Sequence, residues 1–281
     1  MTVPEVAVTH RSNYWQFPAD EWWTPTRGAR LARASDGLAA RCAALVAVRP
    51  DAVFVGRTAA ALWGCSVAAP GAPIETVMPS SSAGIRREGH RRRRRDIPRE
   101  HVTLRDGLWL TTPERTLVDL AADVPLALLV AFGDHILREK LATQTSISDC
   151  VAGAGGQRGV RRARQGIDLL DARAESPPES ILRVTLISAG LPAPIPQHVI
   201  TSRSGEFLAR GDLAYPAERI VIEYDGQHHL SPAQQSKDAD RRHRLSMEGW
   251  WVVTVTAWDL RDPRRAVRKV NEALIQRRYS R

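Results

Sequence analysis

The second half of the chain alternates between helical and strand-like patterns of apolar and polar residues. The segment from Ser176 to Glu179 is typical of a helix start, because serine caps free amide groups and prolines fit a first turn. Gly190 followed by Leu-Pro ends that helix. The runs EFLARGDLAY, RIVIEYD and WWVVTVT (Trp250 to Thr256) predict strands, and Ser231-Pro232 opens a helix between the last two. With the extended piece PIPQHVIT and a last helix from Asp262-Pro263, the predicted order is α-β-β-β-α-β-α.

The first half shows weaker patterns. Residues 1–40 have no clear periodicity, which predicts a loosely structured extension. Thr58 is expected to cap a short helix that Gly64 closes, and Ile74 to Met78 reads as a strand. The stretch TTPERTLVDLAADVPLALLVAFGDHILREK predicts two amphipathic helices, with Pro113 in the first turn of the first one.

Charge adds a candidate partner to this outline. The 281 residues carry a net charge of +9, and lysine and arginine side chains favour polyanions because they release counterions from phosphates. DNA is therefore the expected partner, and the alternative is a merely basic surface. The longest apolar stretch is too short for a membrane span, the N-terminus has no signal-peptide layout, and three scattered cysteines suit a reducing compartment. We therefore expect a cytoplasmic protein with no membrane partner.

Two basic runs are the candidate nucleic-acid contacts. One is a continuous arginine run, which as a strand would point some arginines inward and is therefore expected at an exposed edge or in a loop. The other follows a Gly-rich stretch near residue 155 that reads as a linker. The alternative for both is a solvated charge run. The candidate residues are Arg91, Arg92, Arg93, Arg94, Arg95, Arg161 and Arg162.

Carboxylates at the ends of two predicted strands are the candidate metal ligands. In RIVIEYD, Val221, Glu223 and Asp225 share one face, and the turn after Tyr215 folds Asp212 back towards Glu223. Converging carboxylates repel one another, and a divalent cation held by oxygen ligands relieves that repulsion. Mg²⁺ suits such ligands best, with Mn²⁺ next. The alternative is that these acids form ion pairs with the many arginines of this region.

Other residues near the acids have candidate roles and simpler alternatives. Glu179 either completes the capping box begun by Ser176 or is a fourth acid aimed at the site. His229 is a candidate proton-transfer group, although paired histidines before a helix are common. Arg241 is a candidate source of positive charge, or an i, i+3 partner of Asp238 on a helix surface.

The C-terminal motifs resemble a known superfamily. GDLAYP, VIEYDGQHH, Q-x-x-x-D-x-x-R and GWWVVTVT are similar to uncharacterised bacterial domains related to very-short-patch-repair endonucleases, within the PD-(D/E)xK restriction-endonuclease-like superfamily. The resemblance implies an αβββαβ core and metal-dependent phosphodiester hydrolysis, with Asp212 as the first acid and Glu223 as the second. Asp225 stands where the superfamily usually has lysine, so positive charge would have to come from Arg241, Lys237 or His229.

The front half resembles another family. VFVGRTAAALWG, VMPS and RRDIPREHVTLRDGLWLTTPERTLVDLAA are similar to the C-terminal domain of AbiEi-type antitoxins from type IV toxin–antitoxin systems. The winged helix that precedes this domain in those antitoxins has no counterpart in the pattern of residues 1–40.

Together these patterns predict an α/β protein of two domains, a small α+β antitoxin-like domain and an αβββαβ restriction-endonuclease-like domain. The first expectation is a Mg²⁺-dependent DNA endonuclease or nickase. The alternative is a non-catalytic nucleic-acid-binding protein, antitoxin-like or regulatory, and a third option acts through a toxin or self-association partner. The expected divisions are an extension (1–40), the antitoxin-like domain (41–150), a Gly/Arg-rich linker (151–175) and the nuclease-like domain (176–281).

Overall fold

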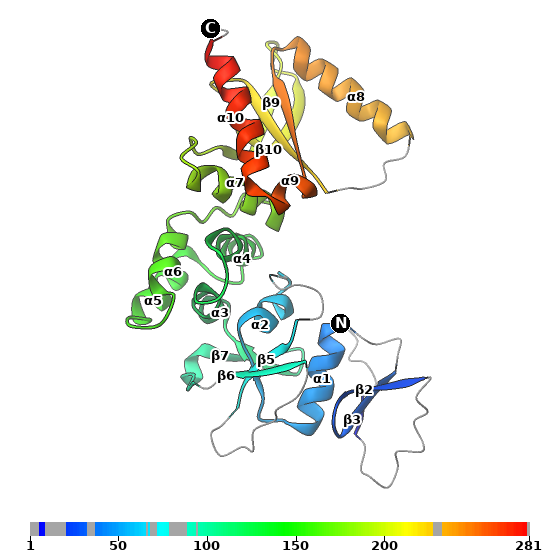
Figure 1. Cartoon of the computed structure of the whole chain (residues 1–281), viewed down its shortest axis with the longest axis vertical. Helices are drawn as coiled ribbons and strands as arrows, with labels where there is room; N and C mark the ends of the chain where they lie inside the picture. Colours follow the sequence, from blue (N-terminus) through cyan, green and yellow to red (C-terminus); the bar gives the residue numbers. More distant parts are fainter. Residues whose placement is uncertain are drawn as a thin grey trace. The chain divides into compact units, whose positions relative to one another are not determined.

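The computed structural model shows a mixed α/β protein (Figure 1). It describes residues 6–8, 21–32, 37–65, 67, 72–78, 89–93, 95–226 and 232–279. The chain divides into two compact units. The first comprises Met1–Val124 and Thr145–Ala163, and the second comprises Pro125–Gln144 and Arg164–Arg281.

The first unit begins with a small antiparallel sheet. Within the described residues its strand order is β1-β3-β2. Ala29 and Leu31 of β3 are buried against Ala40 and Ala44 of α1, and Trp23 packs at the edge of this cluster. The expectation of a loosely structured extension is therefore wrong for the described part, because a short apolar hairpin gains a core from the helix that follows it. The bounds are β1 (Val6–Val8), β2 (Trp22–Thr26), β3 (Ala29–Ala32) and α1 (Leu38–Val48).

A larger sheet forms the rest of the first unit. Among the described strands its order is β6-β5-β4-β8-β7, which leaves β6 and β7 at the edges. The predicted strand from Ile74 and the predicted helix from Pro113 are both confirmed, and Thr112 caps the latter by accepting from the Arg115 amide. The bounds are β4 (Val53–Phe54), α2 (Gly56–Leu62), β5 (Ile74–Val77), β6 (His90–Arg93), the 3-10 helix η2 (Arg99–His101), β7 (Val102–Arg105), β8 (Leu108–Thr111) and α3 (Pro113–Ala121).

Helix α2 begins earlier than its sequence predicts. Its N-cap is Val55, and the expected N-cap, Thr58, lies inside the helix. The Thr58 hydroxyl instead accepts a hydrogen bond from the Glu75 amide at 2.9 Å. The prediction fails because the hydroxyl satisfies an amide of the neighbouring strand β5. Gly64, with φ of 99°, does end the helix as predicted.

The Gly-rich stretch lies between two helices, α5 (Gln144–Gly153) and α6 (Val160–Ile167). Gly159 has φ of 88°, and a Cβ there would lie 2.5 Å from the backbone carbon of Ala121. At this point the chain therefore packs directly on the backbone at the end of α3, which only glycine permits.

The second unit is built on a sheet with the order β12-β11-β10-β9 among its described strands. Strands β9, β10 and β11 run antiparallel, and β11 pairs parallel with β12. Leu213 and Ile222 are buried on the face that packs against α7 and α10, whereas Val221 is buried with Leu245 of α8. The sheet thus has helices on both faces.

The order of elements predicted from Ser176 onward is confirmed, with one short helix, α9, added after β12. The predicted cap of α7 is also confirmed, because the Ser176 hydroxyl accepts from the Glu179 amide. The bounds are α4 (Leu126–Arg138), α7 (Pro177–Ser188), β9 (Ile195–Thr201), β10 (Phe207–Tyr215), β11 (Ile220–Asp225), α8 (Pro232–Met247), β12 (Trp251–Thr256), α9 (Ala257–Arg261) and α10 (Pro263–Tyr279).

Candidate functional site

The candidate acids Asp212 and Glu223 lie where the pairing of β10 with β11 gives way. The last backbone pair at this end of the ladder is Leu213 with Ile222. Beyond it, the Asp212 carboxylate accepts a hydrogen bond of 2.7 Å from the Tyr224 amide. On the other side of β10, Gln197 adopts a left-handed backbone with φ of 53°. An irregular backbone thus surrounds Asp212 and turns its side chain towards β11.

Three carboxylates act on one another here. Burial, together with the nearby charges of Glu179 and Glu223, raises the pKa of Asp212 to about 6, while the Tyr224 amide and Arg241 oppose this rise. The structure therefore brings the two sequence-predicted acids together. Glu179 joins them from the start of α7, whereas Asp225, at the exposed end of β11, acts on the pKa of Tyr224.

Glu179 also holds the start of α7. Its carboxylate accepts hydrogen bonds from the Ser176 hydroxyl at 2.6 Å, the Glu175 amide at 3.0 Å and the Gln197 side chain at 2.8 Å. Glu179 therefore takes part in the cap of α7, as the capping alternative predicted, and also lies close to Asp212.

Arginines of α8 neutralise Glu223. The Arg241 guanidinium donates to both Glu223 oxygens, one of them at 3.1 Å, and Arg242 lies 3.8 Å from the same carboxylate. Arg241 also contacts Asp238 at 3.5 Å, as the i, i+3 spacing suggested. The Arg241 guanidinium thus binds both Glu223 oxygens, which a metal cation would need as ligands.

The residues present do not make up a magnesium site as they are arranged. In the part of the chain that the structure describes, no group of three or more His, Cys, Asp or Glu side chains is placed to hold a metal ion. One Asp212 oxygen accepts from the backbone, and both Glu223 oxygens face Arg241. The arrangement is a charge-compensated cluster of carboxylates and arginines. His229, the candidate proton-transfer group, lies outside the described residues.

The pKa of Asp212 predicts a dependence of stability on pH. An acid whose folded pKa is raised from 3.8 to about 6 stabilises the fold most at low pH, and that contribution is lost as the pH rises through about 6. We expect Asp212→Asn, which keeps the acceptor for the Tyr224 amide, to raise the melting temperature at pH 8 by about 2–4 °C, or about 1 kcal/mol. The gain should shrink at pH 5.

Thermal melts of both proteins between pH 5 and 8 provide the measurement. The matched control is Glu206→Gln, which neutralises an exposed acid just before β10 and should leave the difference between pH values unchanged. If the melting temperatures of the parent and Asp212→Asn differed by the same amount at every pH in this range, the raised pKa of Asp212 would not contribute to the pH dependence of stability.

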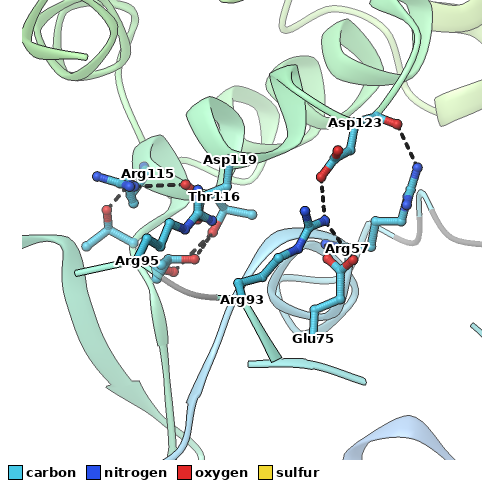
Figure 2. A network of polar contacts seen from close by, with 10 residues as sticks. Arg57, Glu75, Arg93, Arg95, Arg115, Thr116, Asp119 and Asp123 are labelled. Atoms are coloured by element: carbon cyan, nitrogen blue, oxygen red, sulfur yellow. Dashed lines mark hydrogen bonds and ion pairs between the residues drawn. The ribbon is translucent and has the colours of Figure 1, made fainter. Parts of the chain in front are cut away.

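Most of the described arginines in the run at β6 face acids of the first unit (Figure 2). Arg93 pairs with Asp123, and with Glu75 at 2.9 Å. Arg95 lies 2.6 Å from Asp119, and Arg91, about half exposed, lies 3.6 Å from Glu75. The Arg92 guanidinium donates to the Met78 carbonyl. The edge position that the sequence suggested is therefore found, but the guanidinium groups engage groups of the protein. Arg94 is outside the described residues.

Asp119 is the centre of this ion-pair network. Its carboxylate is fully buried and also accepts from Arg115 at 2.9 Å, one turn earlier on α3. Burial raises the pKa of Asp119, and Arg95 and Arg115 oppose that rise. Sequence reasoning missed these acids, although an acid inside an apolar strand or helix, opposite a run of arginines, signals a buried ion pair.

The second basic run contains two different kinds of arginine. The Arg162 guanidinium donates to the carbonyls of Ala121 at 2.8 Å and Val124 at 2.9 Å, so it satisfies free carbonyls at the end of α3. Arg161, on the same helix, is exposed. Arg162 is exposed as well, but its guanidinium is engaged with these two carbonyls.

Comparison with known proteins shows a similarity to a known family in part of the chain. Residues 51–172 match the model of the AbiEi antitoxin C-terminal domain. Two uncharacterized proteins of Mycobacterium tuberculosis, from strains CDC 1551 / Oshkosh and ATCC 25618 / H37Rv, are each 32% identical over 176 residues. These matches cover 62% of this chain and 65% of each relative, so the chain spans less than two thirds of their length.

No solved structure matches the chain. Along the described ranges, every helix is too short or too polar to cross a membrane. The antitoxin-like part of the chain is thus supported by a family match, and the carboxylate–arginine cluster lies beyond the matched residues.

Proposed function

We propose that this protein is an antitoxin-like regulatory protein that binds nucleic acid without cutting it. The observation that carries the proposal is the match of residues 51–172 to the AbiEi antitoxin C-terminal domain. The pairing of Glu223 with Arg241 supports it, because an acid held by a bidentate guanidinium is already charge-compensated. The net charge of +9 favours a polyanion such as DNA.

The exposed arginines of the antitoxin-like region are the proposed phosphate contacts. Arg158, Arg161 and Arg164 are exposed on α6 or directly before it, whereas Arg93, Arg95 and Arg162 are engaged with protein groups. Binding through such side chains depends on salt, because each phosphate contact releases condensed counterions.

The experiment is a titration of labelled duplex DNA, followed by fluorescence anisotropy in EDTA over a range of salt. We expect Arg161→Ala to weaken binding and to reduce the slope of log affinity against log salt by about 1. The melting temperature should not change, since Arg161 is exposed. Arg203→Ala is the matched control, because this arginine is 82% exposed and lies outside residues 51–172.

Two results would count against this proposal. Equal salt slopes for the parent and Arg161→Ala would remove Arg161 from the contact surface. Absence of binding to any duplex at about 0.15 M salt would instead favour action through a protein partner such as a toxin.

A second candidate function is a metal-dependent DNA nuclease that uses Asp212 and Glu223 with Mg²⁺ or Mn²⁺. The observation that favours it is that Glu179 and Glu223 lie close enough to Asp212 for their charges to add to the effect of burial in raising its pKa. It requires Glu223 to leave Arg241. Cleavage of plasmid DNA that depends on a divalent cation and is lost in Asp212→Ala and Glu223→Ala would establish it.

A further inference from the structure

A pocket of about 430 Å³ opens beside the carboxylate–arginine cluster, within the second unit. Its walls include Trp250 and Trp251, Arg242 and Ser246 of α8, and Arg277 of α10. We call it the tryptophan pocket. Its volume lies within the range of about 300–1,000 Å³ that is usual for sites of small ligands.

The two tryptophans differ in how the fold uses them. Trp250 packs against the core cluster beneath α8 and stacks on His198, with ring centroids 5.8 Å apart. Trp251 begins the edge strand β12 and keeps 36% of its surface exposed. Trp250 therefore serves the core, whereas Trp251 presents an indole ring to the pocket.

The charged groups of the tryptophan pocket are all positive. Arg242 is about half exposed and lies 3.8 Å from Glu223, so it borders both the pocket and the acid cluster. The Arg277 guanidinium carbon lies 5.7 Å from the Trp251 ring centroid. One of its nitrogens, Nη2, donates to the Gly249 carbonyl at 2.7 Å, and its buried Nε has no hydrogen-bond partner among the described residues. None of the described residues lining the pocket is acidic. An aromatic ring in a pocket that is also lined by two guanidinium groups suits a flat ligand that carries a negative charge.

We propose that the tryptophan pocket binds one unpaired nucleotide of single-stranded DNA. The base stacks on Trp251, and Arg242 and Arg277 take the adjacent phosphates. A stacking site tolerates every base, because each base has a π-face. In a regular duplex the bases are stacked on one another and are not free to enter, so the pocket distinguishes unpaired from paired DNA. This inference rests on the proposed binding of nucleic acid and adds the strand state that is recognised.

The test is a pair of anisotropy titrations of the full-length chain in EDTA, with a labelled thymidine oligonucleotide and with a labelled duplex. Base stacking on an aromatic side chain is worth about 1–3 kcal/mol, so Trp251→Leu should weaken single-strand binding about 5- to 150-fold. Duplex affinity should change less than about twofold, and Trp251→Phe should keep most of the single-strand affinity.

The matched control is Trp258→Leu. Trp258 is 55% exposed and has two arginines over its ring, Arg261 at 5.7 Å and Arg265 at 5.3 Å, but it lies on α9 outside the tryptophan pocket. Its replacement should leave single-strand affinity unchanged. Photocrosslinking of the parent protein to an oligonucleotide containing bromodeoxyuridine, followed by mass spectrometry, needs no variant and should place the crosslink on Trp251.

Each outcome decides between the two proposals. Duplex binding without single-strand binding, or equal single-strand affinity in parent and Trp251→Leu, overturns the pocket assignment and leaves the proposed function standing. Binding of neither probe overturns both. Should Trp251→Leu fail to fold, a crosslink on another residue overturns the assignment, and a crosslink on Trp251 supports it.

Discussion

Replacement of Asp119 by alanine is expected to lower the free energy of unfolding by about 3–5 kcal/mol, because it leaves two arginines without their buried acid. The Asp119 carboxylate is fully buried, and Arg115 beside it is only 6% exposed. Arg95, from the arginine run, shares the same acid (Figure 2). The loss is large because two guanidinium groups would have to move to water or stay unpaired in a dry interior.

Urea denaturation of the parent and Asp119→Ala measures this loss. The control is Glu139→Ala, which removes an exposed acid paired with Arg138 and should cost less than about 1 kcal/mol. A cost for Asp119→Ala as small as that of the control would mean that Arg95 and Arg115 find other partners, and the network would not secure β6 to α3.

Replacement of Gly159 by alanine is expected to cost about 2–5 kcal/mol. Two effects add, since alanine pays about 1–2 kcal/mol for a left-handed backbone and a clash with backbone in a packed site costs about 1–3 kcal/mol. The new Cβ would lie 2.5 Å from the backbone carbon of Ala121 and from the backbone nitrogen of Ala122. Backbone at the end of a helix cannot yield as a flexible side chain can.

Thermal melting and urea denaturation check this expectation. Gly155→Ala is the matched control, because Gly155 lies in the same Gly-rich stretch, has no positive φ, and a Cβ added there would meet no atom within 4 Å. It should be neutral or slightly stabilising. Equal stability of both variants would show that Gly159 does not pack closely on the end of α3.

Local capping signals in the sequence predicted helices well. Ser176 before Pro177 caps its helix as expected, and Pro113 stands in the first turn of α3 as predicted, since a hydroxyl and a proline each act within one turn. The order of the strands from Ile195 onward was predictable for a similar reason, because period-two patterns survive wherever one face is buried. These signals depend only on near neighbours in the chain.

Contacts between distant segments were not predictable in the same way. The direction in which the side chains of the arginine run point depends on Glu75 and Asp119, which belong to other elements. The Thr58 hydroxyl does not cap α2 as expected, because it accepts a hydrogen bond from the Glu75 amide, 17 residues away. The alternation of residues in β11 identified Glu223 as a candidate metal ligand, but it could not predict that Arg241 of α8 pairs with its carboxylate.

The carboxylate–arginine cluster therefore separates the two candidate functions. A nuclease needs Glu223 free of Arg241, whereas a binding protein gains a stable, neutralised cluster beside the tryptophan pocket. The match of residues 51–172 to an antitoxin domain favours the nucleic-acid-binding protein. The closeness of Glu179 and Glu223 to Asp212 is the observation that favours the nuclease.

The most direct test of nucleic-acid binding without cutting uses one preparation of the full-length protein and one DNA substrate. Anisotropy in EDTA should show binding that weakens with salt, and incubation of the same DNA with Mg²⁺ or Mn²⁺ should leave it intact. Cleavage that requires the metal and disappears in both Asp212→Ala and Glu223→Ala would contradict this account.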